Sequence, residues 1–167
     1  MATADRLAAL AGELRAALAV LGRVLAYHDT FSARPGSEAQ STENAIILSD
    51  IVVSFYTCLE TVFVRISQFF ENSLDSAQWH RDLLRRMTHS VTGVRERVLS
   101  DESYAALSEL LSFRHFKRYY FELDYDWDRL DLVLRKFAIA RERVMGEMNR
   151  YVGYLEELAE TARRGGA

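Results

Sequence analysis

Four side chains in the second half of the sequence have the types and the spacing to act together on a phosphodiester. At about 100° per residue, Arg114 and Arg118 continue the apolar stripe of a leucine-rich helix, and His115 and Tyr119 lie one turn apart on its flank. A guanidinium binds phosphate or carboxylate through a planar fork of donors, and an imidazole transfers protons near neutral pH. These groups could hold and cleave a phosphodiester without a metal. The same spacing also fits structural arginines that pair with a carboxylate on a neighbouring helix, and from the spacing alone we favour this second interpretation.

A lone carboxylate is a candidate partner for these arginines. Residues 41–72 are predicted to form a long helix that is apolar around most of its circumference, with its polar side chains along one stripe. Glu60 lies off that stripe, and a carboxylate on an apolar face needs a cation. Arg114 or Arg118 is the natural candidate. The alternative, in which Glu60 faces water at a gap in the bundle, is equally consistent with the sequence.

The whole chain has the composition of a single helical domain. Its 167 residues include one proline and eight glycines, so long stretches contain no helix breaker, and 49% are hydrophobic. A net charge of −3 excludes a general nucleic-acid-coating protein, so any RNA site must be a local basic patch. Cys58 is the only cysteine, which excludes a disulfide framework. No stretch has the pattern of a targeting signal or a membrane span, and we expect a cytoplasmic protein.

Apolar spacing and helix-capping residues predict five main helices, which must position the arginine segment. They cover about residues 4–28, 41–72, 76–88, 100–121 and 126–162. The expected N-terminal caps of the second, fourth and fifth helices are Ser41 or Thr42, Ser100 with Asp101, and Asp126. We expect residues 30–42 to form a mobile polar loop, residues 94–99 to form one or two helical turns, and the tail 163–167 to fray. This order indicates an all-α, antiparallel up-and-down bundle, with one domain over residues 1–167.

The arginine segment also resembles a known family pattern. Residues 107–134 read LSELLSFRHFKRYYFELDYDWDRLDLVL: a leucine-rich helix, Phe-Arg with a polar neighbour, an aromatic residue, and an acidic turn into the last long helix. This pattern resembles the hallmark region of the HEPN superfamily, and within it the HepT-like toxins of prokaryotic toxin–antitoxin pairs. The resemblance implies a HEPN-type bundle that forms a symmetric homodimer, in which two arginine helices meet at one composite cleft. It also implies metal-independent cleavage of single-stranded RNA and a nucleotidyltransferase-type antitoxin as partner.

The resemblance assigns roles to individual residues. Arg114 matches the family arginine and would bind phosphate, and its polar neighbour His115 would act as acid or base. Tyr119 stands where the family has the histidine that assists attack by the ribose 2′-hydroxyl. Three outcomes are open: His115 supplies an imidazole to nearly the same place, Tyr119 hydrogen-bonds the phosphate while the arginines act electrostatically, or the fold persists without the activity. Phe121 stands at the tyrosine that the antitoxin modifies, so modification would fall on Tyr119 or Tyr120, or would not occur.

Other basic side chains are candidates for extending an RNA site. Lys117 and Arg118 follow the family arginine, and Arg85 lies on the preceding short helix, where Trp79 could stack a base. A solvated helix face explains the basic residues around Arg85 as well, and we favour it there. The sequence contains no phosphate-binding loop, nucleophile elbow or metal-ligand spacing, so we expect no metal and no cofactor. The competing function is an inactive HEPN-type module that binds RNA, a nucleotide or a partner protein.

Overall fold

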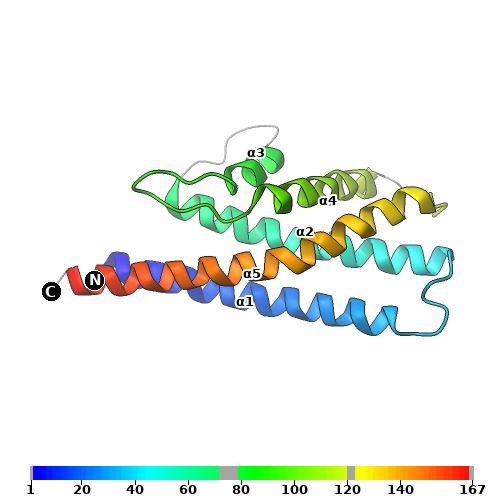
Figure 1. The fold of residues 1–167 in the computed structure, drawn as a ribbon, viewed down its shortest axis with the longest axis horizontal. Coiled ribbons are helices and arrows are strands. Elements are labelled where there is room, and N and C mark those ends of the chain that lie inside the picture. The colour runs from blue at the N-terminus through cyan, green and yellow to red at the C-terminus, as the bar shows by residue number, and fades with distance from the viewer. Residues whose placement is uncertain (1, 72–78, 120–122, 166–167) are drawn as a thin grey trace.

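The computed structural model describes residues 2–71, 79–119 and 123–165 of the chain (Figure 1). The helices in these ranges are α1 (Ala2–Ser32), α2 (Thr42–Phe70), α3 (Trp79–Arg86), α4 (Asp101–Tyr119) and α5 (Trp127–Gly165). The described ranges contain no β-strand. The prediction of an all-α bundle of about five helices is therefore confirmed.

Four long helices run up and down along one axis, and the short α3 lies at the side of the bundle (Figure 1). The chain reverses direction between α1 and α2, between α2 and α4, and between α4 and α5, so long helices that follow one another along the chain are antiparallel. α5 packs against both α1 and α4, and α3 packs against α2 and α4. Ion pairs also join α1 to α5, one between Arg15 and Glu156 and one between Asp29 and Arg141. The helix that carries the arginines is therefore enclosed by α2, α3 and α5.

The central helix is α2, which contacts each of the other four helices. Its apolar side chains are buried, and Phe55, Leu59 and Phe63 expose no surface. Its polar side chains form the exposed stripe that the sequence predicted, with Asp50 and Thr57 among them. By length and composition alone, α2 is the one described helix that could cross a membrane, a test that the core helix of a bundle also passes. Burying α2 on nearly all sides brings Glu60 into the interior.

Three helices begin at the side-chain caps that the sequence predicted. Ser41 Oγ, Ser100 Oγ and Asp126 Oδ1 each accept a hydrogen bond from the backbone N–H three residues later, at 3.2 Å. Each bond satisfies one of the amides that has no partner in the first turn of a helix. These caps fix the starts of α2, α4 and α5, and thereby the register of the residues that follow.

Two helices are longer than the apolar pattern predicted. α1 continues to Ser32, so its connection to α2 is only residues 33–41. The Asn44 side-chain amide donates to the backbone carbonyls of Gly36, Ser37 and Ala39, which ties this loop to the first turn of α2. α5 continues through residues 163–165, which we expected to fray. Helices extend in this way when no proline or strong capping residue stops them.

The segment after α3 is also different from the prediction. Instead of helical turns over residues 94–99, the chain makes an antiparallel bridge between Val91 and Arg95, with Gly93 in the left-handed region at φ 72°. Glycine adopts this conformation without the steric penalty of other residues. The predicted helix residues 76–78 and 120–121 lie outside the described residues.

Candidate functional site

Glu60 is buried between α2, α3 and α4, where it forms a bidentate ion pair with Arg114. Arg114 Nη2 lies 3.0 Å from Glu60 Oε2, and Nη1 donates to Oε1 at 3.3 Å. The Glu60 side chain is only 7% exposed, so the solvent-facing alternative left open by the sequence does not hold. The Arg114 side chain is 21% exposed. Its guanidinium is therefore anchored by a carboxylate and still reachable from solvent.

His80, in the first turn of α3, is the second partner of Glu60. Its Nδ1 donates to Glu60 Oε1 at 2.5 Å, because an ionised carboxylate can only accept. The ring of Trp79 lies over the His80 ring, with the two centroids 3.6 Å apart. Leu83 and Leu84 anchor α3 in the core. The hydrogen bond at Nδ1 leaves Nε2 as the His80 nitrogen that is available to a ligand.

His115 follows Arg114 on α4 and contacts the His80 ring. The two imidazole rings meet edge to face, with centroids 5.2 Å apart. His115 is exposed, but partial desolvation by its neighbours lowers its pKa below the ordinary value of 6.5, and the positive charges of His80 and Arg114 lower that pKa further, while Glu60 acts in the opposite direction. His115 therefore favours its neutral form, in which one ring nitrogen can accept a proton.

Tyr56 supports the ion pair from α2, one turn before Glu60. Its side chain is fully buried, and the Arg114 guanidinium carbon lies 5.9 Å from the centre of its ring. Its hydroxyl has no hydrogen-bond partner among the described residues. Burial, together with the negative charge of Glu60, raises the pKa of Tyr56, so the phenol stays neutral.

These contacts define one site, which we call the Glu60 cluster: Tyr56, Glu60, His80, Arg114 and His115. Three elements supply it, since α2, α3 and α4 each contribute at least one of the side chains. It combines one guanidinium with two adjacent imidazoles on a buried carboxylate. Such a set can neutralise a phosphate and exchange protons with it.

The other predicted site residues on α4 lie outside the Glu60 cluster. Tyr119 is 70% exposed, and the Arg118 guanidinium carbon lies 5.8 Å from the centre of its ring. Lys117 points instead to Tyr125, where its Nζ donates to the hydroxyl and lies 4.6 Å from the ring centre. Arg118 is exposed because α4 ends at Tyr119. Tyr120 lies outside the described residues.

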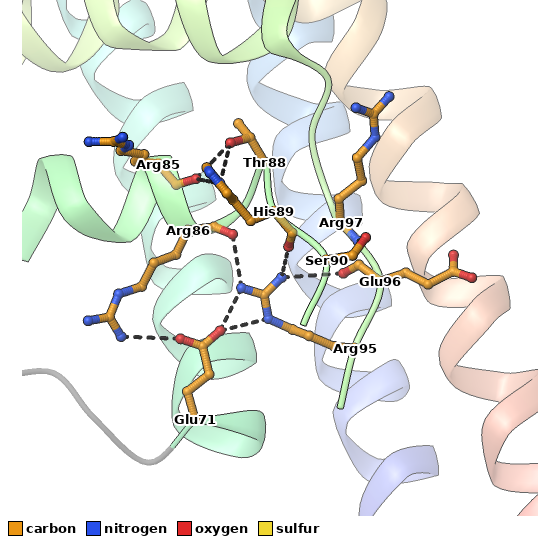
Figure 2. Close-up of polar contacts among 9 residues, drawn as sticks. All are labelled: Glu71, Arg85, Arg86, Thr88, His89, Ser90, Arg95, Glu96 and Arg97. Atoms are coloured by element: carbon orange, nitrogen blue, oxygen red, sulfur yellow. Dashed lines mark hydrogen bonds and ion pairs between the residues drawn. The ribbon is translucent and has the colours of Figure 1, made fainter. Parts of the chain in front are cut away.

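Arg85 faces a different cavity, of about 270 Å³, at the side of α3. The residues that line it are Glu71, Asp82, Arg85, Arg86, His89, Val91 and Arg95. In Figure 2 the Arg85 side chain points away from the hydrogen-bonded network around Arg95. Arg85 is exposed, as the interpretation of a solvated helix face expects, and the structure does not bring it to the Glu60 cluster.

A buried arginine holds the wall of that cavity together (Figure 2). Arg95 is only 3% exposed, and its Nε donates to Glu71 Oε1 at 2.7 Å. Its two Nη atoms donate to the backbone carbonyls of Arg86, His89 and Glu96. Glu71 also pairs with the Arg86 side chain at 3.2 Å. Because every donor group of the guanidinium is used, Arg95 acts as a structural clamp between the end of α2 and the loop after α3.

Sequence reasoning named Arg114 or Arg118 as the candidate partner of Glu60, and the structure has Arg114 in that place; it missed His80. The signal available in the sequence was indirect: an isolated carboxylate on an apolar face has room for more than one donor. Nothing in the spacing of residues 79–86 indicates that the first turn of α3 lies over Glu60. Trp79, a candidate for stacking on a base, stacks instead on His80.

The family model described as HepT-like protein matches residues 47–155, which is more than half of the chain and contains the whole Glu60 cluster. No curated protein and no solved structure gives a significant match.

Proposed function

The chain belongs to the HepT-like protein family of the HEPN superfamily, and on this premise we propose that it is a toxin-type endoribonuclease that cleaves single-stranded RNA without a metal ion. The observation that supports the proposal is the Glu60 cluster. It holds an anchored arginine of α4 beside two imidazoles, one from α3 and one from α4, at a position that solvent can reach. A guanidinium can stabilise the charge on the phosphate and imidazoles can transfer protons, so these groups are able to support RNA cleavage without a metal.

In this proposal Arg114 binds the scissile phosphate and His115 moves a proton. Arg114 keeps donors beyond those that it uses on Glu60, because a guanidinium has five N–H groups. The lowered pKa of His115 keeps a proton acceptor available at neutral pH. Arg118 and Tyr119, both exposed at the end of α4, would contact the RNA on either side of the cleaved bond.

The proposed assembly is a symmetric homodimer in which the α4 helices of two protomers form one cleft. Such a cleft would place two Glu60 clusters along one RNA strand and would exclude water from both. The proposed partner is a nucleotidyltransferase-type antitoxin, and the proposed location is the cytoplasm. In the single protomer, Tyr119 is exposed and therefore accessible to a modifying enzyme.

The second candidate function is an inactive helical module that binds RNA, a nucleotide or a partner protein. Two observations favour it. By the resemblance, Tyr119 stands where the family has its histidine, and Glu60 already neutralises the charge of Arg114. In this case the Glu60 cluster would stabilise the bundle and bind a ligand without cleaving that ligand.

The test is cleavage of a mixed-sequence single-stranded RNA by the purified protein in EDTA. We expect products with 2′,3′-cyclic phosphate and 5′-hydroxyl ends. Arg114→Ala should weaken both RNA binding and cleavage, and His115→Ala should lower the cleavage rate by ~10²-fold or more while binding changes little. The matched control is Arg65→Ala, because Arg65 also pairs with a glutamate from another helix, Glu13, but both side chains are about half exposed.

The two functions give different results in this assay. RNA that stays intact but binds the wild-type protein, with weaker binding by Arg114→Ala, would identify the inactive module. Cleavage by His115→Ala at the wild-type rate, together with loss of cleavage in Tyr119→Phe, would move the proton-transfer role from His115 to Tyr119. Cleavage by Arg114→Ala at the wild-type rate would contradict the phosphate-binding role of Arg114.

A further inference from the structure

His80 is the one imidazole in the Glu60 cluster that the family resemblance does not assign. It comes from α3, whereas Arg114 and His115 both come from α4. Its Nδ1 is fixed by Glu60 at 2.5 Å, its face is covered by Trp79, and its ring touches the ring of His115. These three contacts restrict the orientation of the His80 ring, which lies next to the ring of His115.

The surroundings of the two imidazoles are unequal. His80 lies directly on the buried carboxylate of Glu60, which can balance a positive charge on the ring. His115 has no such contact and faces cations: partial desolvation and the charges of His80, Arg114 and Arg118 lower its pKa, and only Glu60 opposes them. Tyr56, the member of the cluster whose ring lies against the Arg114 guanidinium, stays neutral. Two adjacent groups with opposed environments are the usual arrangement of a general base and a general acid.

We infer that His80, held by Glu60, is the general acid that protonates the leaving oxygen, and that His115 is the general base. This inference rests on the proposed ribonuclease function. His115 takes the proton of the ribose 2′-hydroxyl while O2′ forms a bond to phosphorus. The bond between phosphorus and O5′ breaks, and O5′ takes the proton from His80 Nε2. The products are a 2′,3′-cyclic phosphate and a 5′-hydroxyl, and proton exchange with water returns both rings to their starting forms.

The experiment replaces the bridging 5′-oxygen by sulfur at the mapped cleavage site of the RNA that the wild-type protein cleaves. A thiolate leaves without a proton, so this substrate needs a base but no acid. We expect His80→Ala to cleave the oxygen substrate ~10²-fold or more slowly than the wild type, but to cleave the sulfur substrate at nearly the wild-type rate. His115→Ala should cleave both substrates slowly, because the attacking 2′-hydroxyl is the same in each and needs a base.

A second variant separates chemistry from folding. His80→Gln keeps a side-chain N–H donor for Glu60 and should show the same selective loss on the oxygen substrate. The matched control is His89→Gln, at an exposed histidine just after α3, which should cleave both substrates like the wild type. Each variant is compared with itself on two substrates, so a smaller folded fraction lowers both rates equally and does not imitate the effect.

The inference about His80 fails if His80→Gln lowers the cleavage rates of both substrates equally, because His80 would then be a structural residue or a base. It also fails if His80→Gln lowers neither rate. The proposed function fails in a different way. If the wild-type protein leaves both substrates intact, the proposed ribonuclease function is wrong, and the proposed role of His80 is wrong with it.

Discussion

Removing the Glu60 carboxylate should destabilise the protein by about 3 kcal/mol, because it strands a cation in the interior. Breaking a buried ion pair from one side costs about 3–5 kcal/mol. The Arg114 and His80 side chains are 21% and 19% exposed, so water can partly solvate them, and the lower end of that range applies. Glu60→Ala would leave the Arg114 guanidinium without its bidentate acceptor and the His80 Nδ1 without its hydrogen bond.

Two further variants test the physical reason for this loss. Glu60→Gln keeps an oxygen acceptor and should cost less, about 1–2 kcal/mol. The double variant Glu60→Leu/Arg114→Met removes both charges, and it should cost less than Glu60→Ala even though two residues change. The matched control is Glu13→Ala, because the exposed pair of Glu13 and Arg65 should contribute less than about 1 kcal/mol.

The assay is equilibrium unfolding in urea at one fixed protein concentration, since dimer stability depends on concentration. Far-UV circular dichroism follows the helices, and fluorescence follows both tryptophans, Trp79 on the His80 ring and Trp127 at the start of α5. A loss below about 0.5 kcal/mol for Glu60→Ala, the size found at surface positions, would show that burial of the ion pair has no energetic consequence. A double variant that costs as much as the sum of the two single variants would contradict the stranded-charge argument.

Three other predictions concern the rest of the molecule. Arg95→Met should lower the free energy of unfolding by about 3 kcal/mol, because it removes the donors that satisfy Glu71 and the loop after α3. The control is Arg97→Met at an exposed position, which should change the free energy of unfolding by less than about 0.5 kcal/mol. The protein should form a dimer that buries at least about 1,000 Å² in total, and light scattering that shows a monomer at micromolar concentration would refute the composite cleft. An NMR titration of His115 should give a midpoint below 6.5. Because its pKa is lowered by folding, the contribution of His115 to stability should be present above the unfolded pKa and should be lost as the pH falls through the folded pKa, and His115→Gln should remove this dependence.

The sequence predicted the fold because its helices have clear physical signals. The apolar spacing gave the five helices, and the caps at Ser41, Ser100 and Asp126 gave three of their starts. Helix ends were less predictable, since a helix with no breaker can continue beyond its apolar pattern. α5 reaches Gly165 although residues 163–165 are exposed, and Arg163 in its last turn pairs with Asp5 of α1 at 3.7 Å.

The candidate site was predictable where a charge had to be neutralised. Glu60 stands out in the sequence because a carboxylate on an apolar helix face needs a cation as partner. Arg114 is such a cation, on the apolar stripe of another helix. Arg118 shares that stripe but is exposed, because the stripe leaves the core where α4 ends. His80 was not predictable, since its position depends on how Leu83 and Leu84 dock α3 on α2, which is a tertiary contact without a local pattern.

The contact between α1 and α5 joins segments far apart in the chain, since Arg15 and Glu156 are separated by 141 positions. Translation adds about 5–20 residues per second, so α1 and α2 leave the ribosome several seconds before α5 is complete. During that interval the apolar α2 lacks part of its final cover. A nascent chain with such a surface is a substrate for chaperones and proteases. The amount of active protein in a cell is therefore sensitive to premature termination within α5, even when every residue of the Glu60 cluster has been synthesised.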